Sequence, residues 1–114
     1  MSALHKKTQV IEFKLRDTVM LGCMALDELG QPVDLTNIDV AAQVRDDAGV
    51  LICEMEVEPV VLAEGTYELW APAEAAWVVG DFGIDVQYTD TSGSRPLIRS
   101  SETFYIRMIQ DVTQ

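Results

Sequence analysis

The chain has 114 residues, which suits one domain that can bury its own core. Hydrophobic residues make up 48% and charged residues 24%, a globular composition that argues against wholesale disorder. The formal net charge of −11 argues against nucleic acid and anionic membrane as principal partners, because both are polyanions. The sequence also lacks an apolar run of the roughly 18 residues that a membrane-spanning helix needs.

Residues 1–8 show no periodicity and are expected to form a flexible lead, followed by a single domain over 9–110 and a short tail at 111–114. Within the domain, short segments that alternate apolar and polar residues are separated by turn residues, which is typical of β-strands. A short extended piece is expected at 33–36. The predicted strands, in chain order, are 10–15, 18–26, 38–45, 50–58, 66–70, 84–89 and 97–109.

Two strands have more specific patterns. The segment 18–26 is mostly apolar, which predicts a strand covered on both faces. In 50–58, Leu51 and the apolar residues that alternate after it should face the core, with glutamates on the other side. Pro59 is expected to end this strand, and the sequence Asp-Asp-Ala-Gly at 46–49 predicts the hairpin before it.

One helix is expected, near residues 72–78, where Pro72 stands at a position that a first helical turn tolerates and alanines follow. About seven strands with turns every 8–12 residues indicate an all-β, immunoglobulin-like antiparallel β-sandwich. A small barrel is the alternative. The expected core residues are Phe13, Val19, Leu21, Cys23, Val40, Val44, Leu51, Met55, Tyr67, Leu69, Trp77, Ile84, Val86, Tyr88, Phe104 and Ile106.

The N-terminus has Lys6 and Lys7 but no apolar stretch of signal-peptide length after them. We therefore expect Cys23 and Cys53 to be two reduced core thiols rather than a disulfide. Two cysteines and the single histidine, His5, are too few for a closed zinc site, so no metal or other cofactor is expected.

No arrangement of residues specifies a reaction, and no catalytic residue is assigned. His5 lies in the expected lead, where nothing would orient it for a catalytic triad. Glu54, Glu56 and Glu58 could bind a cation, but the polar face of an exposed strand explains them better. Asp46 and Asp47 could bind calcium with Asp81, Asp85 or Asp90, yet turn chemistry explains them better because no Asp-x-Asp-x-Asp-Gly loop exists.

Trp70 and Trp77 flank the predicted helix, where packing of that segment is favoured over a ligand platform. Arg95, Arg99 and Arg107 do not interleave with aromatic residues as in proteins that bind single-stranded nucleic acid. Glycoside hydrolysis by a pair of carboxylates remains an alternative, although few aromatic residues are left to line a sugar cleft.

Charge is unevenly distributed along the chain. Residues 1–26 have a net charge of +2 and residues 91–114 a net charge of +1, whereas residues 27–90 hold fifteen acidic residues and only Arg45, a net of −14. A solvated acidic surface explains this distribution most simply. Head-to-tail self-assembly, or docking on a basic partner, is the alternative.

The order of several motifs resembles that of a known family. The motifs are Arg16-Asp17-Thr18, the stretch Asp27-Glu28-Leu29-Gly30-Gln31-Pro32-Val33-Asp34-Leu35-Thr36, Ala42-Gln43-Val44-Arg45-Asp46 with Gly49, Gly65-Thr66-Tyr67-Glu68-Leu69, Trp77 before Gly80-Asp81-Phe82, Asp85-Val86-Gln87-Tyr88-Thr89, Thr103-Phe104-Tyr105-Ile106 and Asp111-Val112-Thr113. Together they resemble the small immunoglobulin-like β-sandwich structural proteins of tailed bacteriophages, in particular the N-terminal domain of baseplate upper proteins.

This resemblance implies a non-enzymatic phage or prophage structural protein of the tail, baseplate or fibre, located in the virion or the host cytoplasm. Its partners would be other phage structural proteins, with a homo-oligomer as an option, and contact is expected through the edges of the terminal strands, 10–15 and 97–109. The alternatives are a carbohydrate-binding module, a small hydrolase and an acidic inhibitor of a basic enzyme.

Overall fold

Alternating apolar and polar residues form seven strands in the computed structural model, which describes residues 10–95 and 97–110, with the backbone alone for 97–102. The predicted all-β fold is therefore confirmed. The predictions for residues 1–8 and 111–114, and for His5, concern residues outside the described ones. The strands are β1 (Val10–Lys14), β2 (Met20–Met24), β3 (Ile38–Asp46), β4 (Leu51–Val61), β5 (Thr66–Trp70), β6 (Gly80–Asp90) and β7 (Leu97–Ile109).

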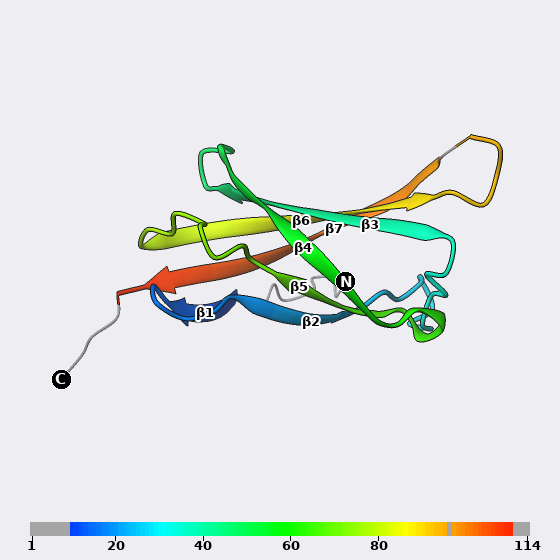
Figure 1. Ribbon diagram of the computed structural model, residues 1–114, viewed down its shortest axis with the longest axis horizontal. Coiled ribbons are helices and arrows are strands. Elements are labelled where there is room, and N and C mark those ends of the chain that lie inside the picture. Colours follow the sequence, from blue (N-terminus) through cyan, green and yellow to red (C-terminus); the bar gives the residue numbers. More distant parts are fainter. Residues whose placement is uncertain (1–9, 96, 111–114) are drawn as a thin grey trace, which may run out of the picture.

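The strands form one continuous sheet that folds over on itself through β4, in the order β1-β7-β6-β3-β4-β5-β2. The first part of β4 pairs with β3, up to Met55, and the second part pairs with β5, from Glu56 onward. Figure 1 shows β4 crossing from one layer to the other. One layer is thus β1-β7-β6-β3 with the start of β4, and the second is the end of β4 with β5 and β2.

This arrangement is the variable-type immunoglobulin pattern, in which strands B, E and D face strands G, F, C and C′. Here β4 serves as both C′ and D. Because β1 and β2 end the strand order without pairing to each other in the described residues, the sheet does not close, and the barrel alternative is wrong. The expectation of purely antiparallel pairing also needs correction, because β1 pairs with β7 in parallel, with Val10 opposite Tyr105.

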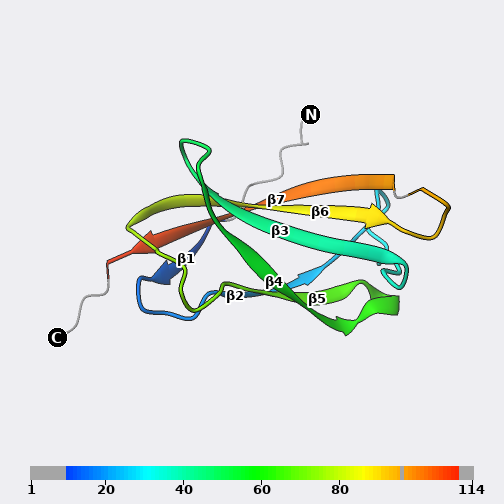
Figure 2. The ribbon, with the colours of Figure 1, turned by 45° about the horizontal axis from the view of Figure 1, so that its top comes forward.

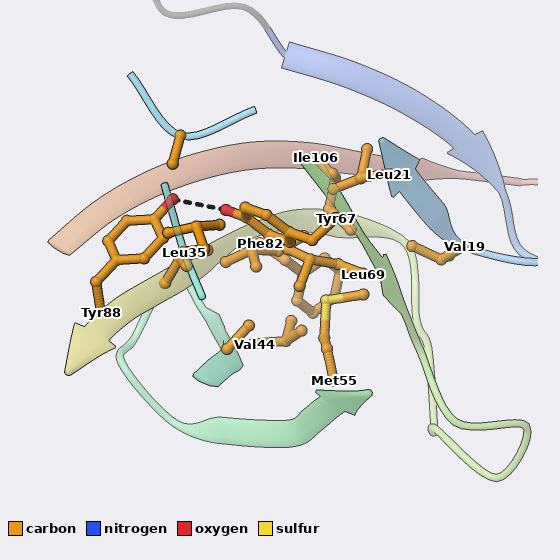
Figure 3. Close-up of a cluster of buried hydrophobic side chains, with 14 of the residues drawn as sticks. Val19, Leu21, Leu35, Val44, Met55, Tyr67, Leu69, Phe82, Tyr88 and Ile106 are labelled. Atoms are coloured by element: carbon orange, nitrogen blue, oxygen red, sulfur yellow. Dashed lines mark hydrogen bonds between the residues drawn. The ribbon is translucent and has the colours of Figure 1, made fainter. Parts of the chain in front are cut away.

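The core lies between the two layers, and ten of the expected core residues are buried in it (Figure 3). Phe13, Cys23, Val40, Trp77 and Phe104 are partly buried against it. The buried set also includes Ala25, Leu35, Ala42, Phe82 and Met108, which were not in the expected list.

A pair of tyrosines joins the two layers inside this core. The hydroxyls of Tyr67 on β5 and Tyr88 on β6 lie 2.7 Å apart in a hydrogen bond, and the rings meet edge to face. Figure 3 shows this bond beside Leu35, which is 1% exposed. This hydrogen bond gives each of the two buried hydroxyls a partner among apolar side chains.

The helix predicted near residues 72–78 is wrong. The segment is irregular, with a single turn in which Ala75 N donates to Pro72 O. About seven residues cannot form a stable helix without tertiary support. Trp77 instead packs edge to face on Phe82 with ring centroids 5.2 Å apart. The only helical turn among the described residues is the 3-10 turn Leu62–Glu64.

Two predictions on β4 are also wrong. Leu51 is 44% exposed, because it follows a hairpin that projects beyond the two layers (Figure 2). Pro59 does not end the strand, which continues to Val61. Pro59 lies opposite Tyr67, whose backbone groups face β2, so the proline nitrogen points away from β5 and no ladder hydrogen bond is lost.

The strand predicted as covered on both faces, β2, has one covered face. Leu21 is buried and Cys23 partly buried, whereas Met20, Gly22 and Met24 are exposed on the outer side. The apolar character of this outer row is therefore a surface feature.

The predicted hairpin at 46–49 and the turn chemistry of Asp46 are confirmed. Oδ1 of Asp46 accepts hydrogen bonds from the backbone N–H groups of Ala48 and Val50, and Gly49 adopts a φ of 86°. The carboxylate is therefore occupied in holding the turn.

Candidate functional site

Two surfaces of the described residues have features that bear on function. In the described residues, no group of three or more His, Cys, Asp or Glu side chains is placed to share a metal ion. Within the same residues, no helix is long and apolar enough to cross a membrane. Cys23 and Cys53 are both partly buried and are not joined in a disulfide, as the sequence predicted. Burial raises the pKa of the Cys53 thiol.

The first surface lies on the outside of β1, β7 and β6, where Arg107 stands between two carboxylates. The register places Arg107 opposite both Glu12 and Asp81. Its Nε donates to Asp81 Oδ1 at 2.7 Å, and its Nη1 lies 3.9 Å from Glu12 Oε2. The hydrogen bond and charge of Asp81, followed by the charge of Glu12, raise the pKa of Arg107. The two ion pairs link β1, β7 and β6, and the Asp81 carboxylate is bonded to Arg107.

A shallow hollow of about 230 Å³ opens beside this ion pair, lined by Val10, Asp81, Tyr105 and Ile106. Val10 and Tyr105 are each more than 40% exposed. The hollow holds one carboxylate, Asp81, already bonded to Arg107. The described residues therefore do not give this hollow the second carboxylate that glycoside hydrolysis requires.

Of the two terminal strands expected to provide open edges, β1 does so. It is the last strand on its side of the sheet in the described residues. The prediction for 97–109 is only partly right, because the end of β7, from Tyr105 to Ile109, is covered by β1. The other end strand of the sheet is β2, which was not among the predicted edge strands.

The second surface is the outside of the layer formed by β2, β5 and the end of β4, which we call the acidic outer face. Its residues are the outward side chains of these strands: Met20, Gly22, Met24, Glu56, Glu58, Thr66, Glu68 and Trp70. Trp70 is 37% exposed and donates its indole N–H to Glu68 at 3.0 Å. The face therefore combines apolar side chains with three carboxylates.

The predicted polar row of glutamates is divided between the two layers. Glu54 lies opposite Gln43 of β3, whereas Glu56 and Glu58 lie opposite Trp70 and Glu68 of β5. This division follows from the crossing of β4, which a strand pattern alone does not reveal. Only the last two glutamates belong to the acidic outer face.

The two tryptophans also separate. Trp77 packs against the core, as expected for the segment around it, whereas Trp70 belongs to the acidic outer face. Trp70 is the last residue of β5 and alternates outward from the buried Leu69, which places it on the outside of the layer.

The strand order defines the class of protein as an immunoglobulin-like β-sandwich. No family model matches the chain, and no curated protein matches it in sequence. A solved structure does match it: the N-terminal domain of phage TP901-1 ORF48, with a TM-score of 0.65 and 16% sequence identity, over 88% of this chain and 84% of that chain. The predicted resemblance to a phage domain is therefore confirmed at the level of the fold.

Proposed function

We propose that this chain is a structural protein of a phage or prophage virion, associated with the tail, baseplate or fibre, and that it acts through protein–protein contacts without catalysis. The likeness to the ORF48 domain is the observation that carries this proposal. The open edges of β1 and β2 support it, because unpaired backbone groups at a sheet edge invite strand addition. Its partners would be other proteins of the particle.

The charge supports protein partners over nucleic acid or membrane. A net charge of −11 repels phosphate backbones and anionic lipid headgroups alike. Like-charged copies also repel one another, so a homo-oligomer would need its contacts outside the acidic segment 27–90. Such an oligomer would be detected by light scattering at several salt concentrations.

The proposal is tested by the protein composition of particles induced from the host that carries the gene. We expect mass spectrometry to find the chain in gradient-purified particles, in a fixed ratio to the tail proteins, and gold-labelled antibody to mark the tail region. Detection only in the unassembled soluble fraction would contradict the proposal. Co-purification there with a basic enzyme would favour the inhibitor alternative.

A carbohydrate-binding module is the second candidate, and the exposed Trp70 beside Glu68 is the observation that favours it. Aromatic rings next to carboxylates can stack on sugars and bond their hydroxyls. A glycan array with the original chain and with Trp70→Ala distinguishes the two candidates. A carbohydrate-binding module would bind a glycan and lose that binding in Trp70→Ala, whereas the structural proposal predicts no such glycan.

A further inference from the structure

The edge of β2 has open backbone groups on a defined set of residues. Val19 O accepts from Ala71 N, and Ala25 N donates to Gly65 O, so the odd-numbered residues of β2 turn their backbone groups toward β5. The N–H and C=O groups of Met20, Gly22 and Met24 therefore point the other way. No strand of the described residues lies on that side.

The side chains of the same three residues form one border of the acidic outer face. Met20 and Met24 are 37% and 49% exposed, and Gly22 stands between them with nothing near the position that a Cβ would take. Directly across from Gly22 is Glu68, and across from Glu68 is Glu58. The missing side chain at Gly22 thus leaves a gap that leads from the open edge to two glutamates.

No cation of the described part of the chain forms an ion pair with these glutamates. In the described residues, the ion pairs involve Arg107 and none includes Glu56, Glu58 or Glu68. Like charges directly opposite each other on neighbouring strands destabilise a sheet, and Glu58 and Glu68 are such a pair. A cationic side chain that reached them would remove this repulsion.

We propose that the β2 edge binds an extended segment of another protein in which Lys or Arg alternates with apolar residues. The segment adds as a strand beside Met20–Met24. Its basic side chains lie on the acidic outer face, where the one beside Gly22 extends toward Glu68 and Glu58, and its apolar side chains lie on the opposite face, next to Leu21 and Cys23. This inference rests on the proposed contact function and specifies the chemistry of the partner.

The kind of segment that binds the β2 edge follows from the charge of the acidic outer face and from the length of a Lys or Arg side chain. A second copy of the chain would bring β2 edges together with −11 on each molecule, whereas a basic strand complements the face. An added strand lies about 4.8 Å from β2 and about 9.6 Å from β5, a gap that the flexible stem of Lys or Arg can bridge only where no side chain intervenes. Gly22 provides that opening.

The test uses a synthetic ten-residue peptide of alternating Lys and Val, added to the full ¹⁵N-labelled chain, with a Glu–Val peptide as the charge control. We expect the Lys–Val peptide to shift and protect the amides of Met20, Gly22 and Met24, and the Glu–Val peptide to leave them unchanged. Shifts centred on β1, or spread evenly over the surface, would overturn the proposal.

Two variants test the gap and the charges separately. Gly22→Val fills the gap in a strand conformation that valine favours, and Glu58→Gln with Glu68→Gln removes both charges. Each should weaken peptide binding about fivefold, the upper range for one exposed ion pair. The matched double variant Glu54→Gln with Glu74→Gln changes the net charge equally and should bind as the original chain does.

Equal peptide binding by the original chain and all of these variants would overturn the inference. The inference would also be overturned if, without peptide, protection of the β2 amides rose with protein concentration, because that result assigns the edge to self-assembly. Either result leaves the particle composition, and hence the proposed function, unaffected. Absence of the chain from particles together with specific peptide binding would instead contradict the proposed function alone.

Discussion

At the scale of single residues, Gly65 occupies a backbone position where a side chain would collide with neighbouring backbone atoms. It adopts a φ of 75°, and a Cβ there would lie 2.7 Å from Val33 O and 2.9 Å from Ala25 O. These contacts are with backbone atoms, which cannot move aside as a flexible side chain would. A methyl group at this position therefore forces the chain between β2 and β5 to shift.

Three glycine-to-alanine variants separate conformational strain from collision. Gly65→Ala should lower the free energy of unfolding by about 3 kcal/mol, because a left-handed residue costs about 1–2 kcal/mol and overpacking adds a similar amount. Gly30→Ala has the strain without the collision, so about 1 kcal/mol is expected. Gly22→Ala has neither and should be neutral. Equal effects in urea denaturation would contradict this account.

The buried tyrosine pair predicts an energetic coupling between the two layers. Tyr67→Phe and Tyr88→Phe each remove one hydroxyl from the 2.7 Å hydrogen bond. A double-mutant cycle should give a coupling free energy of about 1 kcal/mol, the net value of such a bond. Thermal unfolding of the four proteins measures this value. Additive single effects would show that the hydroxyls stabilise the fold independently.

Burial of Cys53 makes its thiol a slow nucleophile. Because desolvation raises its pKa, the thiol stays neutral at a pH where a free cysteine already ionises in part. We expect iodoacetamide to label Cys53 more slowly at pH 8 than it labels a cysteine in a short peptide. Labelling at the peptide rate would contradict this expectation.

The same shift has a consequence for stability. The pKa is higher in the folded chain than in the unfolded chain, so the contribution is complete below the unfolded thiol pKa and is lost as the pH rises above it. The variant Cys53→Ala should therefore lose less stability between neutral and alkaline pH than the original chain. Parallel pH profiles for the two proteins would contradict this reasoning.

At the scale of elements, Arg107 links β1 to β7 and β6 on the protein surface. Its side chain is 47% exposed, so solvent screens both ion pairs. Arg107→Gln should lower the free energy of unfolding only slightly at low salt and still less at high salt. Chemical denaturation at two ionic strengths measures this cost. A loss of stability as large as that from a core substitution, or no change with salt, would show that β1 depends on this residue more than its exposure indicates.

The existence of the elements could be predicted from the sequence to a large extent, because alternation marks every strand and turn residues such as Asp46 and Gly49 mark the breaks. The pattern fails where tertiary packing decides. Proline and alanines at 72–78 have helical propensity, but packing of Trp77 on Phe82 determines the conformation. Leu51 alternates inward in sequence, yet no second layer covers it.

The candidate site was less predictable than the fold. A run such as Met-Leu-Gly-Cys-Met in β2 is apolar at nearly every position, so the sequence did not distinguish a doubly covered strand from an edge strand with an apolar outer row. Strand order decides this question, and strand order depends on pairing between residues far apart in the chain. Gly22, an interior strand glycine, was the available signal, because such glycines mark places where another group approaches closely.

At the scale of the whole molecule, the crossing of β4 produces the surface that we assign to partner contact. It brings Glu56 and Glu58 next to β5 and leaves β2 as the last strand of that layer. Glu56, Glu58 and Glu68 thus lie together near an open edge without an ion pair among the described residues, while Arg107 pairs with Asp81 and Glu12 on the outside of the other layer. The two outer faces therefore differ in whether their carboxylates are paired.

The most direct test of contact through open strand edges compares amide hydrogen exchange of the chain alone and in the assembled particle. We predict that the amides of Met20, Gly22 and Met24 exchange more slowly in the particle, whereas those of the core residues Ile84 and Val86 exchange at the same rate in both. Unchanged exchange at β2 in a particle that contains the chain would contradict this account.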